Sequence, residues 1–237
     1  MITSEIKNAL QDLSSPEKGE FLPRFFKTGQ GEYAEGDQFI GVSVPDQRIV
    51  AKGFCSKINL KQLGELLSSA IHEHRLCALL MLVFKFEKAK DISEKQEIVN
   101  FYLKNIKHIN NWDLVDTSCY KILGRYYFEI EDDTVLKNLS EKNHLWSQRI
   151  AIVSTMLHVK KGSFTLMKAL VLTNLNHPHD LMQKANGWLL REMGKKKESE
   201  LLSFLVVNYQ RMPRTTLRYA IEKLDENTRQ DFLQGRL

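Results

Sequence analysis

Apolar residues recur along most of this chain at the spacing of a helix. After residue 59 they stand at i, i+3, i+4 and i+7 almost throughout, whereas the strict apolar-polar alternation of a half-buried strand is scarce. The clearest segments are residues 60–70, 73–89, 94–108, 112–128, 145–159, 164–172, 179–193, 199–207 and 214–224. Asparagine, glycine and proline fall between these segments, where caps and breakers belong. The pattern predicts an all-α chain.

Small residues recur on successive helices at a nearly constant distance. Ala78, Cys119, Ala151, Ala185 and Ala220 follow one another at steps of 41, 32, 34 and 35 residues. Periods of this size, each made of two helices, are typical of an α-α superhelix, a solenoid of HEAT-like repeats. The inner surface of such a solenoid is a long concave groove. Chance similarity among amphipathic helices is the alternative explanation.

We expect residues 1–237 to form one domain, with N-terminal helices and an irregular loop over residues 1–58 and helical repeats over residues 59–237. The loop is residues 28–44, which contain four glycines and no helical period. Gly29 and Gly31 superficially resemble a phosphate-binding loop, but no G-K-[ST] follows and no strand precedes them. We therefore expect an ordered connection between an N-terminal helix pair and the repeats.

The composition is that of an ordinary globular protein. The chain is 43% hydrophobic and 27% charged, and no apolar run approaches the length of a membrane helix. Its start lacks a basic segment followed by an apolar one, so we expect a cytoplasmic protein without a membrane anchor. The three cysteines are widely spaced and form no C-x-x-C pair, which predicts reduced core residues.

Several catalytic designs are absent from the sequence. It contains no H-E-x-x-H, no G-x-S-x-G, no Rossmann glycine pattern and no protein-kinase set. His72 and His74, like His177 and His179, are two residues apart and diverge on a helix, so neither pair suits a metal. We expect these histidines to be solvated or to cap helices. No metal and no cofactor is expected.

Positive charge gathers in the second half of the chain. Residues 149–237 contain 15 Lys and Arg against 8 Asp and Glu, a net +7, whereas residues 1–148 contain 19 against 21, a net −2. Such asymmetry is a modest argument for a polyanionic partner. Solvated helix faces are the alternative, because protein surfaces are normally rich in charge.

Each of the three tryptophans has a charged residue one helical turn later. The pairs are Trp112 with Asp116, Trp146 with Arg149, and Trp188 with Arg191. Each pair shares one helix face, and an aromatic ring beside a fixed charge suits cationic or sugar-like ligands. The alternatives are a core aromatic for Trp112 and an ion pair with Arg149 for Asp116. Asp113 points elsewhere and suits a first helical turn, where it would cap or orient.

Four segments, in this order, resemble the patterns of one family. They are Phe-Ile-Gly-Val-Ser-Val-Pro-Asp-Gln-Arg at 39–48, Asn-Trp-Asp-Leu-Val-Asp at 111–116, Trp-Ser-Gln-Arg-Ile-Ala at 146–151 and Gly-Trp-Leu-Leu-Arg-Glu at 187–192. Over nearly its whole length the chain resembles the DNA alkylation repair family of AlkD-type, HEAT-like-repeat DNA glycosylases. It departs from the family at Asn111, where another aromatic can occur, at Phe25, which replaces a tyrosine, and at residues 29–37, which resemble an insertion.

The resemblance implies a role for each candidate residue. Asp116 is then the catalytic carboxylate, Trp112 and Trp188 are aromatic walls, and Arg149 contacts the base or a phosphate. Further basic residues expected to contact DNA are Arg191, Lys184, Arg48, Lys27, Arg214 and Arg218. Asp113 and Trp146 are expected to support the site, Trp146 as a buried residue that sets Arg149 in place.

The implied activity is that of a monofunctional DNA glycosylase, which hydrolyses the N-glycosidic bond of purines alkylated at N3 or N7. We expect its partner to be double-stranded DNA containing alkylated bases, bound in the concave groove by a monomer. Two alternatives stay open at this point. One is a non-catalytic HEAT-like-repeat protein that binds distorted or branched DNA, and the other is a protein-binding adaptor.

Overall fold

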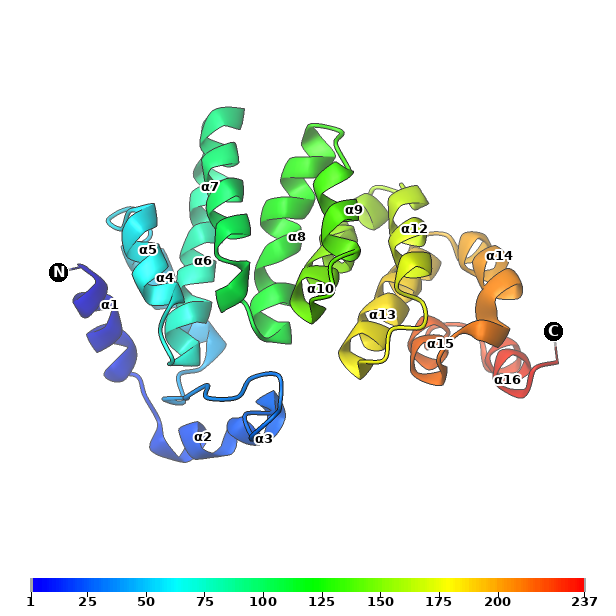
Figure 1. Ribbon diagram of the computed structural model, residues 1–237, viewed down its shortest axis with the longest axis horizontal. Helices are drawn as coiled ribbons and strands as arrows, with labels where there is room; N and C mark the ends of the chain where they lie inside the picture. Colours follow the sequence, from blue (N-terminus) through cyan, green and yellow to red (C-terminus); the bar gives the residue numbers. More distant parts are fainter. Residues whose placement is uncertain (1, 237) are drawn as a thin grey trace. The chain divides into compact units, whose positions relative to one another are not determined.

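The computed structural model describes residues 2–236, and these form helices joined by turns and short loops (Figure 1). Extended pairing within the described residues is limited to a single bridge between Gln38 and Ile71. The all-α prediction is therefore confirmed. None of the helices in residues 2–236 has both the length and the apolar character needed to cross a membrane.

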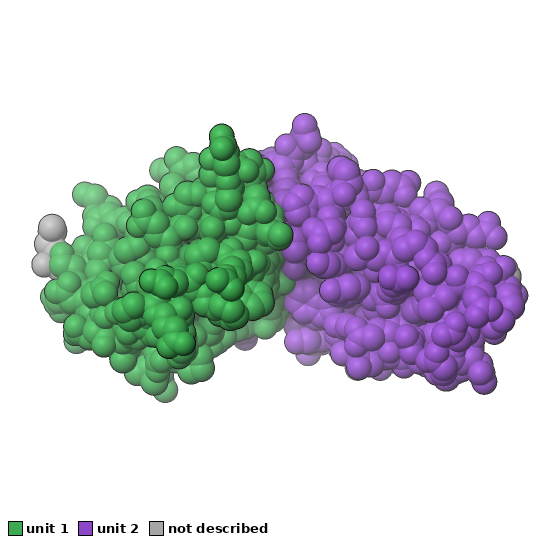
Figure 2. All heavy atoms as spheres, turned by 90° about the horizontal axis from the view of Figure 1, so that it is seen from below, with its two compact units in different colours: residues 1–122 green, residues 123–237 purple. Residues whose placement is uncertain are grey.

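The chain divides into two compact units, residues 1–122 and residues 123–237 (Figure 2). The helices that begin in the first are α1 (Ile2–Gln11), α2 (Pro16–Phe21), α3 (Pro23–Phe26), α4 (Val44–Phe54), α5 (Leu60–Leu67), α6 (His72–Lys88), α7 (Ile92–Lys104), η1 (Ile106–His108) and α8 (Trp112–Glu129). The second contains α9 (Thr134–Ser140), α10 (Leu145–Ser154), α11 (Met156–Lys160), α12 (Thr165–Thr173), α13 (Asp180–Lys196), α14 (Glu198–Asn208), η2 (Tyr209–Arg211), α15 (Arg214–Ala220) and α16 (Glu226–Gln234). The single domain and its division at residue 58 stay predictions.

Helix α6 is the centre of the first unit. Helices α4 and α5 pack against it (Figure 1), and its residues from His72 to Val83 are buried in an unbroken run. A helix that is buried around its whole circumference must be apolar on all sides or must pair its polar groups internally. Residues 76–83 satisfy the first condition. The run His72-Glu73-His74-Arg75 has to satisfy the second.

The predicted helices correspond to observed ones, with differences at particular places. Segment 145–159 is divided at Thr155 into α10 and α11, and segment 214–224 ends earlier, at Ala220. Helices α9 and α16 were not among the predicted segments. The first is only seven residues long, and the second buries only Phe232 among its nine residues, so neither carries a strong apolar period.

The segment between α3 and α4 is irregular, as predicted, but α1, α2 and α3 precede it in the described residues rather than the expected helix pair. Its own polar groups order it. The carboxylates of Glu32 and Glu35 accept the backbone N–H groups of Gly29 and Gly31, at 2.8 and 2.9 Å. The segment then pairs with the start of α6 through the Gln38–Ile71 bridge. The three cysteines are buried and none of them forms a disulfide bond within residues 2–236, which confirms that interpretation.

Candidate active site

Helix α8 begins at the predicted tryptophan. The Asn111 side-chain oxygen accepts the backbone N–H of Trp112 at 2.9 Å, and the Asp113 carboxylate accepts that of Leu114 at 2.8 Å. Both bonds satisfy N–H groups that have no partner within the first turn of a helix. Trp112, Asp113 and Asp116 are each half-buried, while Leu114 and Val115 are fully buried. The first turn of α8 therefore presents Trp112 and Asp116 on a face that is not fully buried.

The indole ring of Trp112 is held by a stack of aromatic rings from the N-terminal part of the chain. Phe26 lies nearly parallel to Trp112, with ring centroids 5.5 Å apart and planes 10° apart. Phe26 in turn stacks on Phe39 at 5.0 Å, and both phenylalanines contact the imidazole ring of His72, at 4.9 and 4.8 Å. Ring pairs at such distances contribute about 0.5–1.5 kcal/mol each beyond the area that they bury. The stack fixes one face of Trp112.

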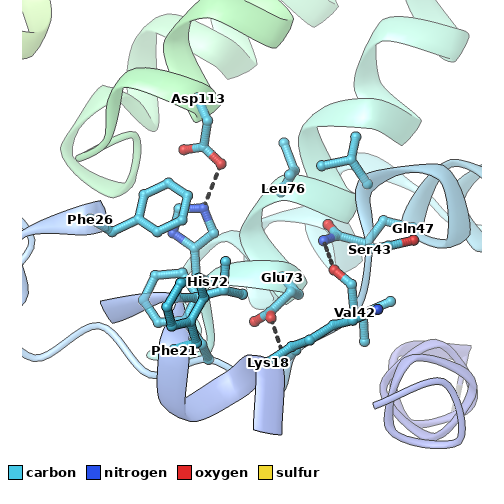
Figure 3. Close-up of a pocket in the computed structure, with 14 residues that line it drawn as sticks. Lys18, Phe21, Phe26, Val42, Ser43, Gln47, His72, Glu73, Leu76 and Asp113 are labelled. Atoms are coloured by element: carbon cyan, nitrogen blue, oxygen red, sulfur yellow. Dashed lines mark hydrogen bonds and ion pairs between the residues drawn. The ribbon is translucent and has the colours of Figure 1, made fainter. Parts of the chain in front are cut away.

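Below this stack lies a buried cluster of charged side chains. His72 Nε2 is 2.8 Å from the Asp113 carboxylate (Figure 3), and His72 Nδ1 is 3.5 Å from the carboxylate of Asp37. Asp37 also accepts from Arg75 Nη2 at 2.5 Å and from Asn110 Nδ2 at 3.1 Å. Arg75 further donates to the carbonyl oxygen of residue 69 at 2.8 Å. The cluster joins α6, α8 and the 27–43 segment.

The cluster shifts the pKa values of His72 and Asp37. Burial lowers the pKa of His72, but the Asp113 carboxylate beside it and the hydrogen bond that His72 donates to Asp37 more than compensate and raise that pKa to about 9. Burial raises the pKa of Asp37, and the hydrogen bond from His72 together with the charge of Arg75 brings it below its usual range. His72 is therefore an imidazolium at neutral pH, between two carboxylates.

The glycine in the 39–48 segment explains how the loop fits against α6. Gly41 has a φ of +79°, and a Cβ there would lie 2.7 Å from the backbone nitrogen of Gly19. Its N–H donates to the Glu73 carboxylate at 2.8 Å, and the N–H of Ile40 donates to the same group. Only glycine combines this backbone conformation with so close an approach. The motif thus positions Phe39 against His72.

Asp116 lies one turn further along α8, above a second buried network. Tyr102 is fully buried on α7, and its hydroxyl is 2.9 Å from Ser118 Oγ, which donates to the carbonyl oxygen of Leu114 at 2.5 Å. Because the Ser118 hydroxyl donates its one hydrogen to the carbonyl oxygen of Leu114, the Tyr102 hydroxyl is the donor to Ser118 Oγ. Burial raises the pKa of Tyr102 well above its usual range, and the charge of Asp116 adds to that effect. The base of the Asp116 turn is therefore rigid.

A pocket of about 170 Å³ opens beside the cluster in the first unit (Figure 3). Its walls are mostly apolar and come from Phe21, Phe26, Phe39, Val42, Val44 and Leu76, while polar groups come from Lys18, Ser43, Gln47, His72, Glu73 and Asp113. Glu73 is already bonded to backbone N–H groups and Asp113 to His72. The pocket therefore offers mainly shape and apolar surface.

Arg149 and Trp146 lie on α10 in the second unit. Trp146 is buried, as predicted, and so is Arg149, whose Nη1 donates to the carbonyl oxygen of Leu181 at the start of α13. The neighbouring Gln148 accepts from His177 Nε2 at 2.9 Å, and His179 caps α13 by accepting the N–H of Leu181. The connection between α12 and α13 is thus tied to α10 beside Arg149.

Trp188 and Arg191 lie on α13, where a glycine allows close helix packing. A Cβ on Gly187 would lie 2.6 Å from the carbonyl oxygen of Thr216, because α15 packs directly on α13. Trp188, the next residue, is half-buried. Arg191 forms an ion pair with Glu222 and lies 3.9 Å from Glu192. The 187–192 segment therefore combines a glycine needed for helix packing, Gly187, with the half-buried ring of Trp188 and the ion-paired guanidinium of Arg191.

The remaining basic candidates lie at the surface of their units. In the first unit Lys27, which is 3.8 Å from Glu32, and Arg48 on α4 are exposed. In the second unit Arg214 and Arg218 on α15 are exposed, and half-buried Lys184 on α13 pairs with Asp180 at 2.7 Å. Surface ion pairs of this kind are worth little and open easily for another anion. The roles of all the predicted site residues stay predictions.

The histidine interpretation was right for one pair and wrong for the other. His179 caps a helix, as expected, but His72 and His74 are almost completely buried rather than solvated. The reason is that the 27–43 segment and the start of α8 cover the N-terminus of α6, and His72 gains partners there. Four polar residues in a row, His72 to Arg75, directly before an apolar run on one helix were the signal in the sequence.

Two comparisons with known proteins bear on the identity of the chain. The family model described as DNA alkylation repair enzyme matches residues 6–224. Among solved structures, a predicted DNA alkylation repair enzyme from Enterococcus faecalis is similar, with a TM-score of 0.69 over 90% of this chain and 97% of that chain. Its identity to this chain is 15%, so this likeness shows the fold alone. No curated protein matches the chain significantly.

Proposed function

Since the chain belongs to the DNA alkylation repair enzyme family, we propose that it is a DNA glycosylase that excises purines carrying a positive charge from alkylation at N3 or N7. Asp116 is the proposed catalytic residue. The observation that carries the proposal is the first turn of α8, where Trp112 and Asp116 share one helix face and Trp112 is fixed by the Phe26 stack. Trp188 and Arg149, in the second unit, are proposed to contact the DNA.

The chemistry needs an anion more than an acid. An N3- or N7-alkylpurine is a cation, so the base leaves neutral when its glycosidic bond breaks, and the positive charge passes to the deoxyribose. No general acid is required for that step. A carboxylate beside C1′ gains attraction as the oxocarbenium-like sugar forms, and it can orient the attacking water. Asp116 supplies such a group on a half-buried, rigidly supported turn.

The size of this effect suits labile substrates. At 4 Å and an effective dielectric of 20, one charge pair is worth about 4 kcal/mol before desolvation is subtracted. A net rate gain on the order of 10² to 10³ is then reasonable. Such a gain suffices for alkylated purines, which already lose their bases readily, and is too small for unmodified ones. The proposal therefore includes selectivity without a tight pocket for the base.

The aromatic rings and the basic side chains complete the proposal. A tryptophan face attracts a neighbouring cation by about 0.5 to 2 kcal/mol, which favours a cationic nucleotide and the developing sugar charge. The exposed basic residues of α15 and the Lys195 to Lys197 run suit the phosphate backbone, whose neutralisation makes binding strongly dependent on salt. Double-stranded DNA with alkylated bases is thus the proposed substrate.

The test is release of methylpurine from alkylated duplex DNA, measured as free base. Wild type is expected to release methylpurine, and Asp116→Asn is expected to release it on the order of 10² to 10³ times more slowly. Asp12→Asn, at an exposed position just after α1, is the matched control and should behave as wild type. A wild-type protein that binds DNA in a salt-sensitive way but releases no base would instead support the non-catalytic alternative.

A further inference from the structure

His72 has an unusual position for a residue outside the proposed reaction centre. Its side chain is 3% exposed and lies between two carboxylates and two phenylalanine rings. Nε2 faces Asp113 at 2.8 Å (Figure 3), and Nδ1 faces Asp37 at 3.5 Å, so the two ring nitrogens point to carboxylates from different parts of the chain. An imidazole can donate from both nitrogens only when it is protonated.

The charges around His72 balance only in that form. Asp37 and Asp113 each carry a negative charge, and Arg75, 2.5 Å from Asp37, supplies one positive charge. A neutral His72 leaves one buried negative charge uncompensated, whereas an imidazolium brings the cluster of these four side chains to neutrality. Buried charges are tolerated when they are paired and bonded, and cost much when they are not.

We infer that His72 is a positioning residue: by donating from both ring nitrogens to Asp113 and Asp37, it fixes the first turn of α8 and so the placement of Trp112 and Asp116. This inference rests on the proposed function for its meaning in catalysis. His72 touches no reacting atom. It acts through Asp113, which stands next to Trp112 in the chain.

The coupling to Trp112 has two routes, both within residues 1–122. Asp113 uses one carboxylate oxygen for the backbone N–H of Leu114 and the other for His72, so it joins the start of α8 to α6. The second route is the ring stack, since Phe26 contacts both His72 and Trp112. Loss of the imidazolium weakens the first route, because an unpaired Asp113 carboxylate would turn toward water.

The charged groups that face His72 determine the pH at which its imidazolium is lost. Helix α6 contributes Arg75 and Glu73, and Glu73 is bonded to backbone N–H groups. The 27–43 segment contributes Asp37, and α8 contributes Asp113. Helix α3 contributes only the ring of Phe26. The pKa of His72 is raised to about 9. His74, one residue beyond Glu73, has a pKa lowered to about 4 by burial and stays neutral. Above pH 9 the positioning should therefore fail through His72.

The first experiment compares the pH dependence of single-turnover base release between wild type and His72→Gln, with spontaneous loss subtracted. Glutamine can still donate one hydrogen bond to Asp113 but carries no charge. At pH 7.5 we expect a rate about tenfold lower for the variant, because small misplacements of catalytic groups cost about that much or more. DNA affinity should stay within about twofold, since the change lies in positioning rather than in phosphate contacts.

The shape of the pH profile separates positioning from general destabilisation. The wild-type rate should fall as pH rises through about 9 and converge on that of His72→Gln, whose rate has no such limb. His74→Gln is the matched control, since His74 is also buried on α6 but its side chain bonds to Ser69, at 2.9 Å, and to neither carboxylate. That variant should keep the wild-type profile. A rate ratio between wild type and His72→Gln that does not change with pH overturns the inference.

A second experiment keeps His72 in place and does not need base release. In histidine-labelled protein, the His72 imidazole resonance should titrate with a midpoint near pH 9, far from the ordinary value of 6.5. In a Trp146→Phe/Trp188→Phe protein, Trp112 fluorescence should change with the same midpoint. Absence of base release by wild type would reject the proposed function but leave these readouts. A His72 midpoint near 6.5, or Trp112 emission that is constant across the His72 titration, rejects the positioning role.

Discussion

Replacing His72 by glutamine should remove a pH-dependent part of the protein's stability. The folded-state pKa of His72 is about 9 against 6.5 in an unfolded chain, so folding favours the protonated form. A group whose pKa is raised by folding stabilises the protein fully below its unfolded pKa, and this contribution is lost as pH rises through the folded pKa. The relevant window is therefore pH 6.5 to 9.

The magnitude follows from the shift itself. One pKa unit corresponds to 1.36 kcal/mol, so a shift of this size is worth about 3 kcal/mol, and it needs little discount because the His72 side chain is buried. Burial opposes the protonated form, and the Asp113 and Asp37 carboxylates reverse that effect. Between pH 6.5 and 9 the contribution should fall by about 1.4 kcal/mol per pH unit.

Urea unfolding of wild type and His72→Gln at half-unit steps from pH 6 to 9.5 measures this directly. Taking the difference between the two proteins cancels other groups, such as Cys77, whose pKa burial raises to about 12. The free-energy advantage of wild type should be largest at pH 6 and should shrink by about 3 kcal/mol by pH 9. Two parallel stability curves would refute the reasoning that His72 is charged in the folded protein.

Three further outcomes are expected. Gly41→Ala should destabilise the first unit by about 2–4 kcal/mol in urea unfolding, because the new Cβ faces both a positive φ and a close backbone contact. Gly36 has a φ of +84° but open space around it, so Gly36→Ala should cost only about 1 kcal/mol. Equal losses of stability in the two variants would contradict the packing argument. Gly187→Ala should lower thermal stability by about 1–3 kcal/mol and slow base release, since α15 leaves no room for a Cβ; an unchanged melting temperature would count against this. In DNA-binding measurements by fluorescence anisotropy, Arg218→Ala should reduce the slope of log affinity against log salt concentration by about one without changing lesion preference. An unchanged slope would show that Arg218 does not contact a phosphate.

Much of the fold could be predicted from the sequence because it depends on local patterns. The apolar period gave the helices from α5 to α8 and from α10 to α15, and asparagine at position 111 marked the start of α8. The pairing of Trp112 and Asp116 on one helix face also follows from their spacing alone. Two short or polar helices were not predicted, because α9 has too few turns to show an apolar period and α16 buries only one residue.

The charged cluster could not be predicted in the same way. It joins Asp37, His72 and Asp113, which are separated by 35 and 41 residues, and no local pattern reports contacts across such distances. The sequence placed His72 on a helix and showed that it diverges from His74, but its burial depends on the 27–43 segment folding over α6. That segment was recognised only as irregular. The resemblance named Asp116 and Trp112 as site residues, while the support beneath them required the structure.

The central claim concerns the Asp116 carboxylate, and one measurement tests it most directly. Single-turnover release of N3- or N7-methylpurine from alkylated duplex DNA should be slower by a factor on the order of 10² to 10³ for Asp116→Asn than for wild type, at equal DNA occupancy and equal folded fraction. Equal rates of release by the two proteins would contradict the account.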